Sequence, residues 1–284
     1  MNKKYKNFGN LYIVSTPIGN IKDITYRSIE ILKNVNIIAA ENIKHTRKLL
    51  NVYKIKSNII SLNKNNENKK SKKIFSELLK KKDIAIVSNA GTPLINDPGN
   101  IIVKMCHKKD IKITPIPGAC SAISAIVSSG IDSKSFCYEG FIPKKKKQIK
   151  KMCKKLSIEK RTIILFETSK RIIKSLKIMK KFFGKNRTIT FSKEITKFWE
   201  TIKKTKLEKL IKWLEFDKKR QKGEIVLIIK GQNNKKKKIK EKILKTFKIL
   251  KKKLSTNLSI KITSKIHNLK KNFLYKYILK KKMT

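Results

Sequence analysis

The sequence predicts an α/β protein with two α/β domains followed by a small helical module. Short β-branched runs alternate with amphipathic stretches between residues 11 and 231, a pattern typical of α/β domains with largely parallel sheets. Nine such runs exceed what one modest sheet needs, so we expect two sheets. After Gly231 the β-branched runs stop, and a lysine-rich segment begins with NNKKKK. The predicted domains are therefore residues 11–117, 118–231 and 232–284, and the first boundary lies at the loop that starts at Pro117.

Each predicted strand is a run of five to seven mostly apolar residues. Strands are expected at 11–15, 36–40, 58–62, 84–88, 111–116, 136–140, 162–167, 187–192 and 224–230. Most of the intervening stretches are amphipathic, which predicts helices packed on the sheets. These helices are expected at 25–34, 67–81, 120–128, 144–156 and 169–182.

The C-terminal module is predicted from two segments that look helical, residues 237–254 and 270–280. In the second segment, Phe273, Leu274, Tyr277 and Ile278 fall on one helical face. An apolar face favours a folded module, with a frayed tail as the alternative interpretation.

The chain of 284 residues carries a formal net charge of +54, which predicts an acidic partner, with RNA first and an anionic membrane second. Of its basic residues, 67 are lysine and only 6 are arginine, whereas proteins that read phosphates and bases favour arginine. Lysine, asparagine and isoleucine, which have A/T-rich codons, are abundant together, so a biased genome is the alternative explanation for much of the lysine. The charge alone therefore identifies no function.

The four cysteines, Cys106, Cys120, Cys137 and Cys153, are scattered without a CxxC pair or a paired histidine. This spacing predicts neither a zinc site nor a disulfide framework and fits a reducing cytoplasm. Residues 1–10 are polar, so no signal peptide is expected. The longest uncharged span, 113–131, is interrupted by prolines and is not expected to cross a membrane. We expect a cytoplasmic protein without a metal.

Three loops with glycine follow predicted strands: STPIGN (15–20), SNAGTPLINDPG (88–99) and PIPGACSA (115–122). The second is much longer than the roughly 2–6 residues that a plain strand-to-helix connection needs, so we expect it to hold a ligand. In open α/β sheets, ligands bind at the carboxyl ends of strands, and glycine lets the backbone approach them. None of the loops is a P-loop or a GxGxxG fingerprint. A nucleoside-type cofactor held by main-chain contacts is therefore predicted.

Seven segments in order carry a resemblance to a known family: LYIVSTPIGNIKDITYRSIEIL, AAENIKHTRKLL, VSNAGTPLINDPG, IPGACSAISA, FCYEGFIPKK, EITKFWET and KGEIVLIIKG. Together they resemble the ribosomal RNA small subunit methyltransferase I family of the tetrapyrrole methylase superfamily. The resemblance covers residues 11–231 and extends to KKNFLYKY in the tail. It implies two α/β domains of the tetrapyrrole methylase type with a cofactor cleft between them. It also implies a homodimer and S-adenosylmethionine-dependent 2′-O-methylation of a decoding-centre cytidine of 16S rRNA in the small ribosomal subunit.

The resemblance also implies which residues bind the methyl donor. These are Pro17, Gly19, Ser88, Ala90, Gly91, Thr92, Ile116, Pro117, Gly118, Phe166, Gly223 and Ile225. The chain departs from the family pattern at Asn89, where aspartate is usual, and at Asn42, Lys44 and Ala119. At Asn89, asparagine keeps a hydrogen-bond acceptor but lacks the negative charge of aspartate. At Lys44, lysine offers a point charge where an arginine would bind a phosphate with two hydrogen bonds.

Methyl transfer to a ribose hydroxyl needs alignment of oxygen, carbon and sulfur, and an acceptor for the hydroxyl proton. The catalytic candidates are Glu41, which follows the apolar run NIIAA, and Glu194 in KEITK. A carboxylate at a helix N-terminus is the structural alternative for Glu41. The residues expected to contact RNA are Arg27, Lys44, His45, Thr46, Arg47, Lys144, Lys145 and Lys197. For the lysine run 144–147, a merely solvated surface is the alternative.

Two other functions remain open on the sequence. One is a methylase of a small corrin or porphyrin precursor, which the superfamily includes. The other is a degenerate RNA-binding protein without activity, a possibility raised by Asn42, Lys44 and Asn89. The basic tail and the segments AAENIKHT and EITKFWET argue against the first, and the intact STPIGN and NAGTP loops argue against the second.

Overall fold

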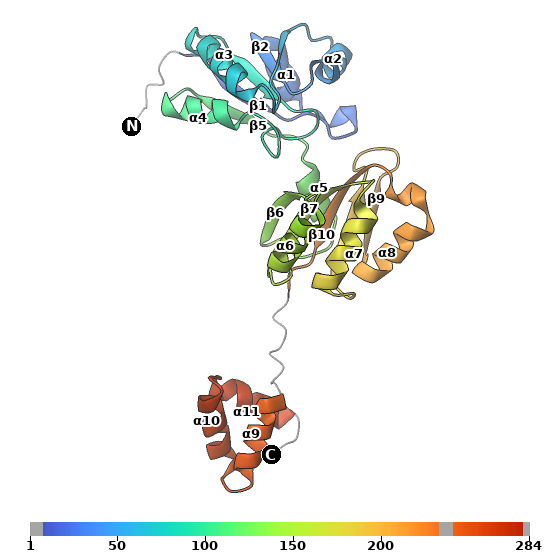
Figure 1. Ribbon diagram of the computed structural model, residues 1–284. Coiled ribbons are helices and arrows are strands. Elements are labelled where there is room, and N and C mark those ends of the chain that lie inside the picture. Colours follow the sequence, from blue (N-terminus) through green and yellow to red (C-terminus); the bar gives the residue numbers. More distant parts are fainter. Residues whose placement is uncertain (1–7, 233–240, 281–284) are drawn as a thin grey trace. The chain divides into compact units, whose positions relative to one another are not determined.

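The computed structural model describes residues 8–232 and 241–280. The chain divides into two compact units, one ending at Gly231 and the other beginning at Gln232. Within the first unit lie two separate five-stranded sheets, each covered by helices (Figure 1). The α/β class is therefore confirmed, while the finer boundary at residue 117 stays a prediction.

The first sheet is fully parallel, with strand order β3-β2-β4-β1-β5. Its strands are β1 (Leu11–Val14), β2 (Ile37–Ala40), β3 (Asn58–Ser61), β4 (Ile84–Val87) and β5 (Ile113–Ile116). Its helices are α1 (Tyr26–Asn34), α2 (Ile43–Val52), α3 (Glu67–Leu79) and α4 (Asn100–Lys108), with a short 3-10 turn, η1, at Ile21–Asp23. Buried side chains of α3 and α4 pack on one face of this sheet, and those of α1 and α2 pack on the other. All four strand-to-helix connections consequently emerge at the same edge of the sheet.

The second sheet is mixed, with strand order β6-β7-β10-β8-β9. Its strands are β6 (Phe136–Phe141), β7 (Thr162–Thr168), β8 (Thr188–Lys193), β9 (Thr201–Lys206) and β10 (Glu224–Ile229). Its helices are α5 (Ser121–Val127), α6 (Lys146–Leu156), α7 (Ile172–Phe183) and α8 (Leu207–Phe216), with a second 3-10 turn, η2, at Lys218–Gln221.

The expectation of largely parallel sheets is wrong for this second sheet. Only β6 and β7 pair in parallel, whereas β10 lies antiparallel to both β7 and β8, and β9 lies antiparallel to β8. The short connection between β8 and β9 allows only an antiparallel hairpin. Strand β9 lies outside the nine expected strands because its sequence, TIKKTK, alternates across an exposed edge and contains no apolar run.

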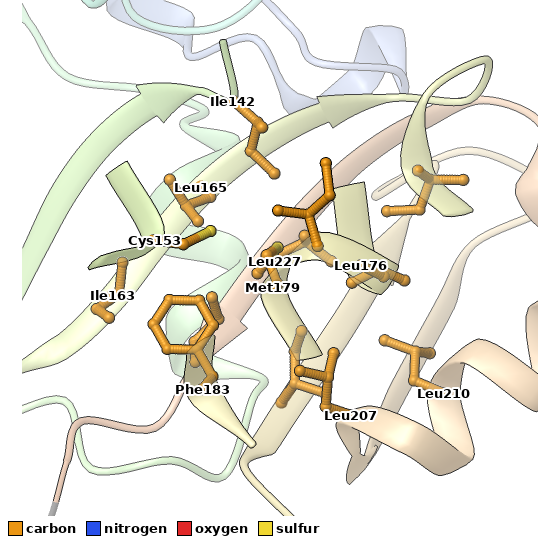
Figure 2. Close-up of a cluster of buried hydrophobic side chains, with 14 of the residues drawn as sticks. Ile142, Cys153, Ile163, Leu165, Leu176, Met179, Phe183, Leu207, Leu210 and Leu227 are labelled. Carbon is orange, nitrogen blue, oxygen red and sulfur yellow. The ribbon is translucent and has the colours of Figure 1, made fainter. Parts of the chain in front are cut away.

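Alternation along the central strands of the second sheet divides its side chains between two cores. Ile163 and Leu165 of β7 face α6, α7 and α8, whereas Ile164 faces the opposite side, which α5 covers. Figure 2 shows Cys153, Leu176 and Met179 near Leu165 and Leu227 of the sheet, and Leu207 of α8 belongs to the same core. Ile18, from the loop after β1, joins the core on the α5 side, so the loop packs directly against the second half of the unit.

The cysteines contribute to packing. All four are free, and Cys106 and Cys153 are fully buried. Burial raises the pKa of the Cys106 thiol to about 12 and that of Cys153 to about 11, so both side chains stay uncharged. Among the described residues, no group of three or more His, Cys, Asp or Glu side chains is placed to hold a metal ion. Within the same residues, no helix has the length and apolar character that a membrane span requires.

Over residues 241–280, the C-terminal unit contains three helices, α9 (Glu241–Lys251), α10 (Thr256–Ile266) and α11 (Lys271–Lys280). Their shared core consists of Ile243, Phe247, Ile260, Leu274 and Ile278, with Tyr277 packed beside it. Leu274 and Ile278 thus lie on the apolar face expected from the sequence, while the Phe273 side chain lies outside the described residues. Helix α10 was not expected, because polar Thr, Asn and Ser residues interrupt its apolar pattern.

Truncating the core of the second sheet should destabilise the protein strongly. Leu227→Ala removes a fully buried side chain from the centre of this core, and leucine-to-alanine changes in cores cost about 2–5 kcal/mol. We expect a corresponding fall in the free energy of unfolding, measured by urea denaturation followed by circular dichroism. Ile158→Ala is the control, because Ile158 is 76% exposed and its loss should cost less than about 0.5 kcal/mol. Equal losses in the two variants would contradict this assignment of the core.

Candidate functional site

Two of the glycine loops are joined to each other by hydrogen bonds. The Thr16 amide donates to the Gly91 carbonyl, and the Gly91 amide donates to the Thr16 carbonyl, both at 3.0 Å. Gly91 has φ +79°, a left-handed conformation that residues with a Cβ rarely adopt. The Thr16 hydroxyl also donates to the Ser88 carbonyl at 3.3 Å. The loops after β1 and β4 therefore form one rigid structure at the carboxyl edge of the first sheet.

A cavity of about 450 Å³ lies beside these loops and is lined by both halves of the first unit. Its volume is within the roughly 300–1,000 Å³ that small-molecule sites usually have. The lining from the first half comes from Ile18, Glu41, and residues 89–92 and 95–97. The lining from the second half comes from residues 120–122, Phe141, 166–169, Ile195 and 223–226.

Seven of the predicted site residues line this cavity. They are Glu41, Ala90, Gly91, Thr92, Phe166, Gly223 and Ile225. They come from segments far apart in the sequence: the end of β2, the loop after β4, β7 and the start of β10. The Thr92 hydroxyl donates to the Ala119 carbonyl at 3.2 Å, which links the second glycine loop to the third.

The other predicted cofactor residues lie near the cavity without lining it: Pro17, Gly19, Ser88, Ile116, Pro117 and Gly118. The glycines among them allow close packing of protein on protein. A Cβ on Gly118 would stand 2.8 Å from the Ser15 Cβ, and one on Gly19 would stand 2.5 Å from Lys197 Cγ. The Ser88 hydroxyl donates to the Ala90 and Gly91 carbonyls at 3.3 and 3.2 Å. These residues therefore shape the loops that form the cavity wall.

The two catalytic candidates have different surroundings. Glu41 lines the cavity at the end of β2, where its Oε2 accepts a hydrogen bond from the Asn89 amide at 3.2 Å. Glu194 does not line it and is paired with Lys197 at 3.1 Å. Burial acts in the opposite direction, but the hydrogen bond from the Glu224 amide and the Lys197 ammonium lower the pKa of Glu194. Glu194 is therefore a weak proton acceptor.

Asp97 is a cavity residue that the sequence did not single out. Burial, followed by the negative charge of Glu41, raises the pKa of Asp97 to about 6, while Lys64 and a hydrogen bond with Ser88 act in the opposite direction. The sequence feature that could have identified Asp97 is its position, because it lies in the SNAGTPLINDPG stretch for which a ligand-binding loop was predicted. Asn96 beside it contacts the Tyr138 hydroxyl of β6, and burial raises the pKa of Tyr138 to about 12.

Apolar and polar side chains from the second half complete the lining. Phe141 and Phe166 are in edge-to-face contact, with ring centroids 5.4 Å apart. Glu167 is 1% exposed and pairs with Arg171 at 2.6 Å, so its charge is neutralised locally. The sequence marked Phe166 but missed Phe141 and Glu167. Glu167 is the last residue of the predicted strand 162–167, and Phe141 directly follows the predicted strand 136–140, so both resemble ordinary strand residues.

The residues expected to contact RNA lie outside the cavity lining. Most of them are exposed, namely Arg27, Lys44, His45, Arg47, Lys144 and Lys145. Thr46 is an exception, because it is 3% exposed and faces the interior of the first half. Lys197 is partly buried and engaged by Glu194 and Glu224. Asn42, one of the departures from the family pattern, caps α2 by accepting a hydrogen bond from the His45 amide at 3.1 Å.

Comparisons with known proteins agree with this architecture. The family model of tetrapyrrole (corrin/porphyrin) methylases matches residues 10–211. Two solved structures share the fold, each covering 78% of this chain at 14% identity. They are a uroporphyrin-III-C-methyltransferase from Thermus thermophilus (94% of that chain, TM-score 0.56) and a diphthine synthase (90% of that chain, TM-score 0.59).

Other relatives are much nearer in sequence. A protein of Buchnera aphidicola subsp. Acyrthosiphon pisum, named ribosomal RNA small subunit methyltransferase I, is 51% identical over 282 residues, which is 99% of both chains. A protein of the same name from Escherichia coli O157:H7 is 40% identical over 271 residues, which is 95% of both chains. Since the similarity runs through the strands, the glycine loops and the C-terminal unit alike, the chain belongs to the ribosomal RNA small subunit methyltransferase I family of tetrapyrrole methylases.

Proposed function

We propose that this chain transfers a methyl group from S-adenosylmethionine to the ribose 2′-oxygen of cytidine 1402 in 16S rRNA. The observation that carries the proposal is the 51% identity, over nearly the whole of both chains, to a relative named ribosomal RNA small subunit methyltransferase I. The cavity formed by the three glycine loops supports it, because it supplies a site for the methyl donor. The similarity to a tetrapyrrole enzyme is only 14% in sequence and concerns the fold, so a tetrapyrrole substrate is not proposed.

The cavity fits the chemical character of this donor. S-adenosylmethionine combines an aromatic nucleoside with a positively charged sulfonium and amino group. Phe141, Phe166 and Ile225 provide an apolar wall for the nucleoside, and Glu41 provides negative charge for the cationic groups. The Oδ1 atom of Asn89 is buried and has no hydrogen-bond partner among the described residues, which suits a ligand hydroxyl or amino group.

In this proposal, main-chain groups of Ala90, Gly91 and Thr92 bind S-adenosylmethionine, and Gly223 and Ile225 contact it from the opposite wall of the cavity. The residues beneath the wall contribute by holding the loops in shape: Pro17, Gly19, Ser88, Ile116, Pro117 and Gly118. When bound, the donor supplies an electrophilic methyl group. The protein's part is to align the ribose oxygen with that group and to exclude water, and such positioning contributes several kcal/mol of barrier lowering.

The RNA substrate is proposed to approach over the exposed basic residues. Lys144 and Lys145 lie just beyond the carboxyl end of β6, next to the cavity residue Phe141, and Arg27, Lys44 and Arg47 lie on α1 and α2. Point-charge lysines attract phosphates without reading sequence, so selection of one cytidine should depend on the shape of the small ribosomal subunit. A homodimer in the cytoplasm completes the proposal.

Product analysis tests the function directly. The protein, tritiated S-adenosylmethionine and isolated small subunits lacking the modification are expected to yield one ribose-methylated cytidine. Mass spectrometry of nuclease fragments would locate it at cytidine 1402. Free 16S rRNA should be methylated poorly, because it lacks the folded particle. A methyl group on a base, or equal methylation of free rRNA and subunits, would contradict this part of the proposal.

Gly91→Val should weaken binding of S-adenosylmethionine by at least tenfold, measured by isothermal titration calorimetry. The left-handed φ of +79° disfavours valine, and the added Cβ would stand 3.1 Å from Ile18 Cγ2 in the cavity wall. The control is Gly184→Val, which carries a similar φ of +83° at the end of α7 but has no neighbour within 4 Å of the added Cβ. Unchanged affinity in Gly91→Val would show that the donor binds elsewhere.

Removing two charges near the cavity should reduce RNA binding in a salt-dependent way. Replacing Lys144 and Lys145 with glutamine should lower the slope of log affinity against log salt by about 1–2, since each phosphate contact contributes roughly 0.7–0.9. The matched control replaces Lys108 and Lys109, exposed at the end of α4 and therefore near the opposite edge of the first sheet. Both variants lose the same charge. The slopes are measured by filter binding of each variant to small subunits. An equal change in slope for the two variants would assign the effect to net charge alone.

A further inference from the structure

Five carboxylates lie in or beside the cavity, and three of them are held in ion pairs. Glu167 pairs with Arg171, while Glu194 and Glu224 both pair with Lys197, at 3.1 and 3.0 Å. Each of these three carboxylates is therefore already engaged by a basic side chain. The two remaining carboxylates are Glu41 and Asp97, which line the cavity and for which no ion pair is found among the described residues.

The structure holds Asp97 firmly in place at the cavity wall. On one side, the Asn96 side chain contacts the Tyr138 hydroxyl and lies against Gly140. On the other side, the amides of Gly99 and Ile101 donate to Glu67 Oε1 at 2.9 and 3.2 Å. The residue between these anchors is partly buried and faces Glu41 at the end of β2. The chain on either side of Asp97 is therefore anchored to β6 of the second half and to α3 of the first half.

We propose that Asp97 is the proton acceptor for the ribose hydroxyl in methyl transfer, and that Glu41 is the neighbouring charge that positions and tunes it. This inference rests on the proposed function. The proton passes from the ribose hydroxyl to a carboxylate oxygen of Asp97, and the ribose oxygen forms a bond to the methyl carbon. The carbon–sulfur bond of the donor breaks with its electron pair remaining on sulfur, which loses its positive charge. The proton on Asp97 then passes to solvent.

The electrostatics of the site suit this role. Burial and, second to it, Glu41 raise the pKa of Asp97 to about 6, and the Lys64 ammonium and the Ser88 hydroxyl limit the rise. The other titratable group that interacts with it is Tyr138, whose own pKa is raised to about 12 and which therefore stays neutral. Since Asp97 must be charged to accept a proton, turnover should fall as the pH drops through about 6. An acceptor with a pKa near the working pH is the most effective.

Asp97→Asn is the first test, made on the full chain with small subunits as substrate. The amide matches the size of the carboxylate but accepts no proton, so kcat should fall by about 10²–10⁴-fold. Affinity for S-adenosylmethionine, measured by calorimetry, should change less than threefold and shows that the variant is folded. Asp97→Glu should recover part of the lost turnover. A loss of donor affinity as large as the loss of turnover would instead make Asp97 a donor-binding residue and overturn the proposal.

The second test measures the interaction between Glu41 and Asp97, first by a method that does not depend on turnover. A ¹³C NMR titration of the Asp97 carboxyl should give a pKa that is raised in the wild type and lower in Glu41→Gln, because a like charge has been removed. The acidic limb of the kcat profile should move to lower pH in the same variant. In Glu224→Gln, the control, that limb should stay in place, because Glu224 is engaged by Lys197. An unmoved Asp97 titration in Glu41→Gln would overturn the role of Glu41.

The two proposals fail in different ways. An active wild type with an equally active Asp97→Asn would refute the acceptor role alone. A wild type that methylates neither small subunits nor free rRNA would refute the proposed function, and the acceptor role with it.

Discussion

The candidate site depends on the pair of hydrogen bonds between Thr16 and Gly91. These bonds join the loops that follow two neighbouring parallel strands, β1 and β4. They require the left-handed backbone of Gly91, and they place the Thr16 hydroxyl against the Ser88 carbonyl in a buried setting. Because both loops are fixed to each other, the segment from Asn89 to Asp97 forms a stable wall and does not behave as a free surface loop.

Contacts between the loops of the two sheets complete the cavity. Asn96 reaches Tyr138 of β6, and the Asn20 amide donates to Thr196 Oγ1 at 3.0 Å. Gly19 lies so close to Lys197 that a side chain on it would clash. Glycine in these loops thus serves two purposes: at Gly91 it permits an unusual backbone conformation, and at Gly19 and Gly118 it permits close approach of two protein segments.

Charge is divided between the outside and the inside of this protein. The chain carries a net charge of +54, yet the described residues that line the cavity include four carboxylates and no lysine or arginine. A basic exterior attracts phosphates over long distances, whereas an acidic cavity favours a cation over a phosphate. This separation suits a reaction between a polyanion and a positively charged methyl donor. It also explains why overall charge was a poor guide to the chemistry of the site.

The sequence by itself determined the α/β class, the positions of nine strands, the long glycine-containing loop at 88–99 and, through resemblance, the family. These features depend on local patterns, because an apolar run or a glycine at a strand end carries its meaning within a few residues. The edge strand β9 was not predicted because TIKKTK has no apolar run. The antiparallel position of β10 between β7 and β8 was not predicted either, because pairing between distant segments is not encoded in a local pattern. Only the tertiary structure decided which residues face the cavity: it brought Asp97 beside Glu41, withdrew Glu194 into an ion pair with Lys197, and buried Thr46. The physical reason is that burial and charge pairing depend on neighbours from distant segments, and these neighbours exist only once the chain has folded.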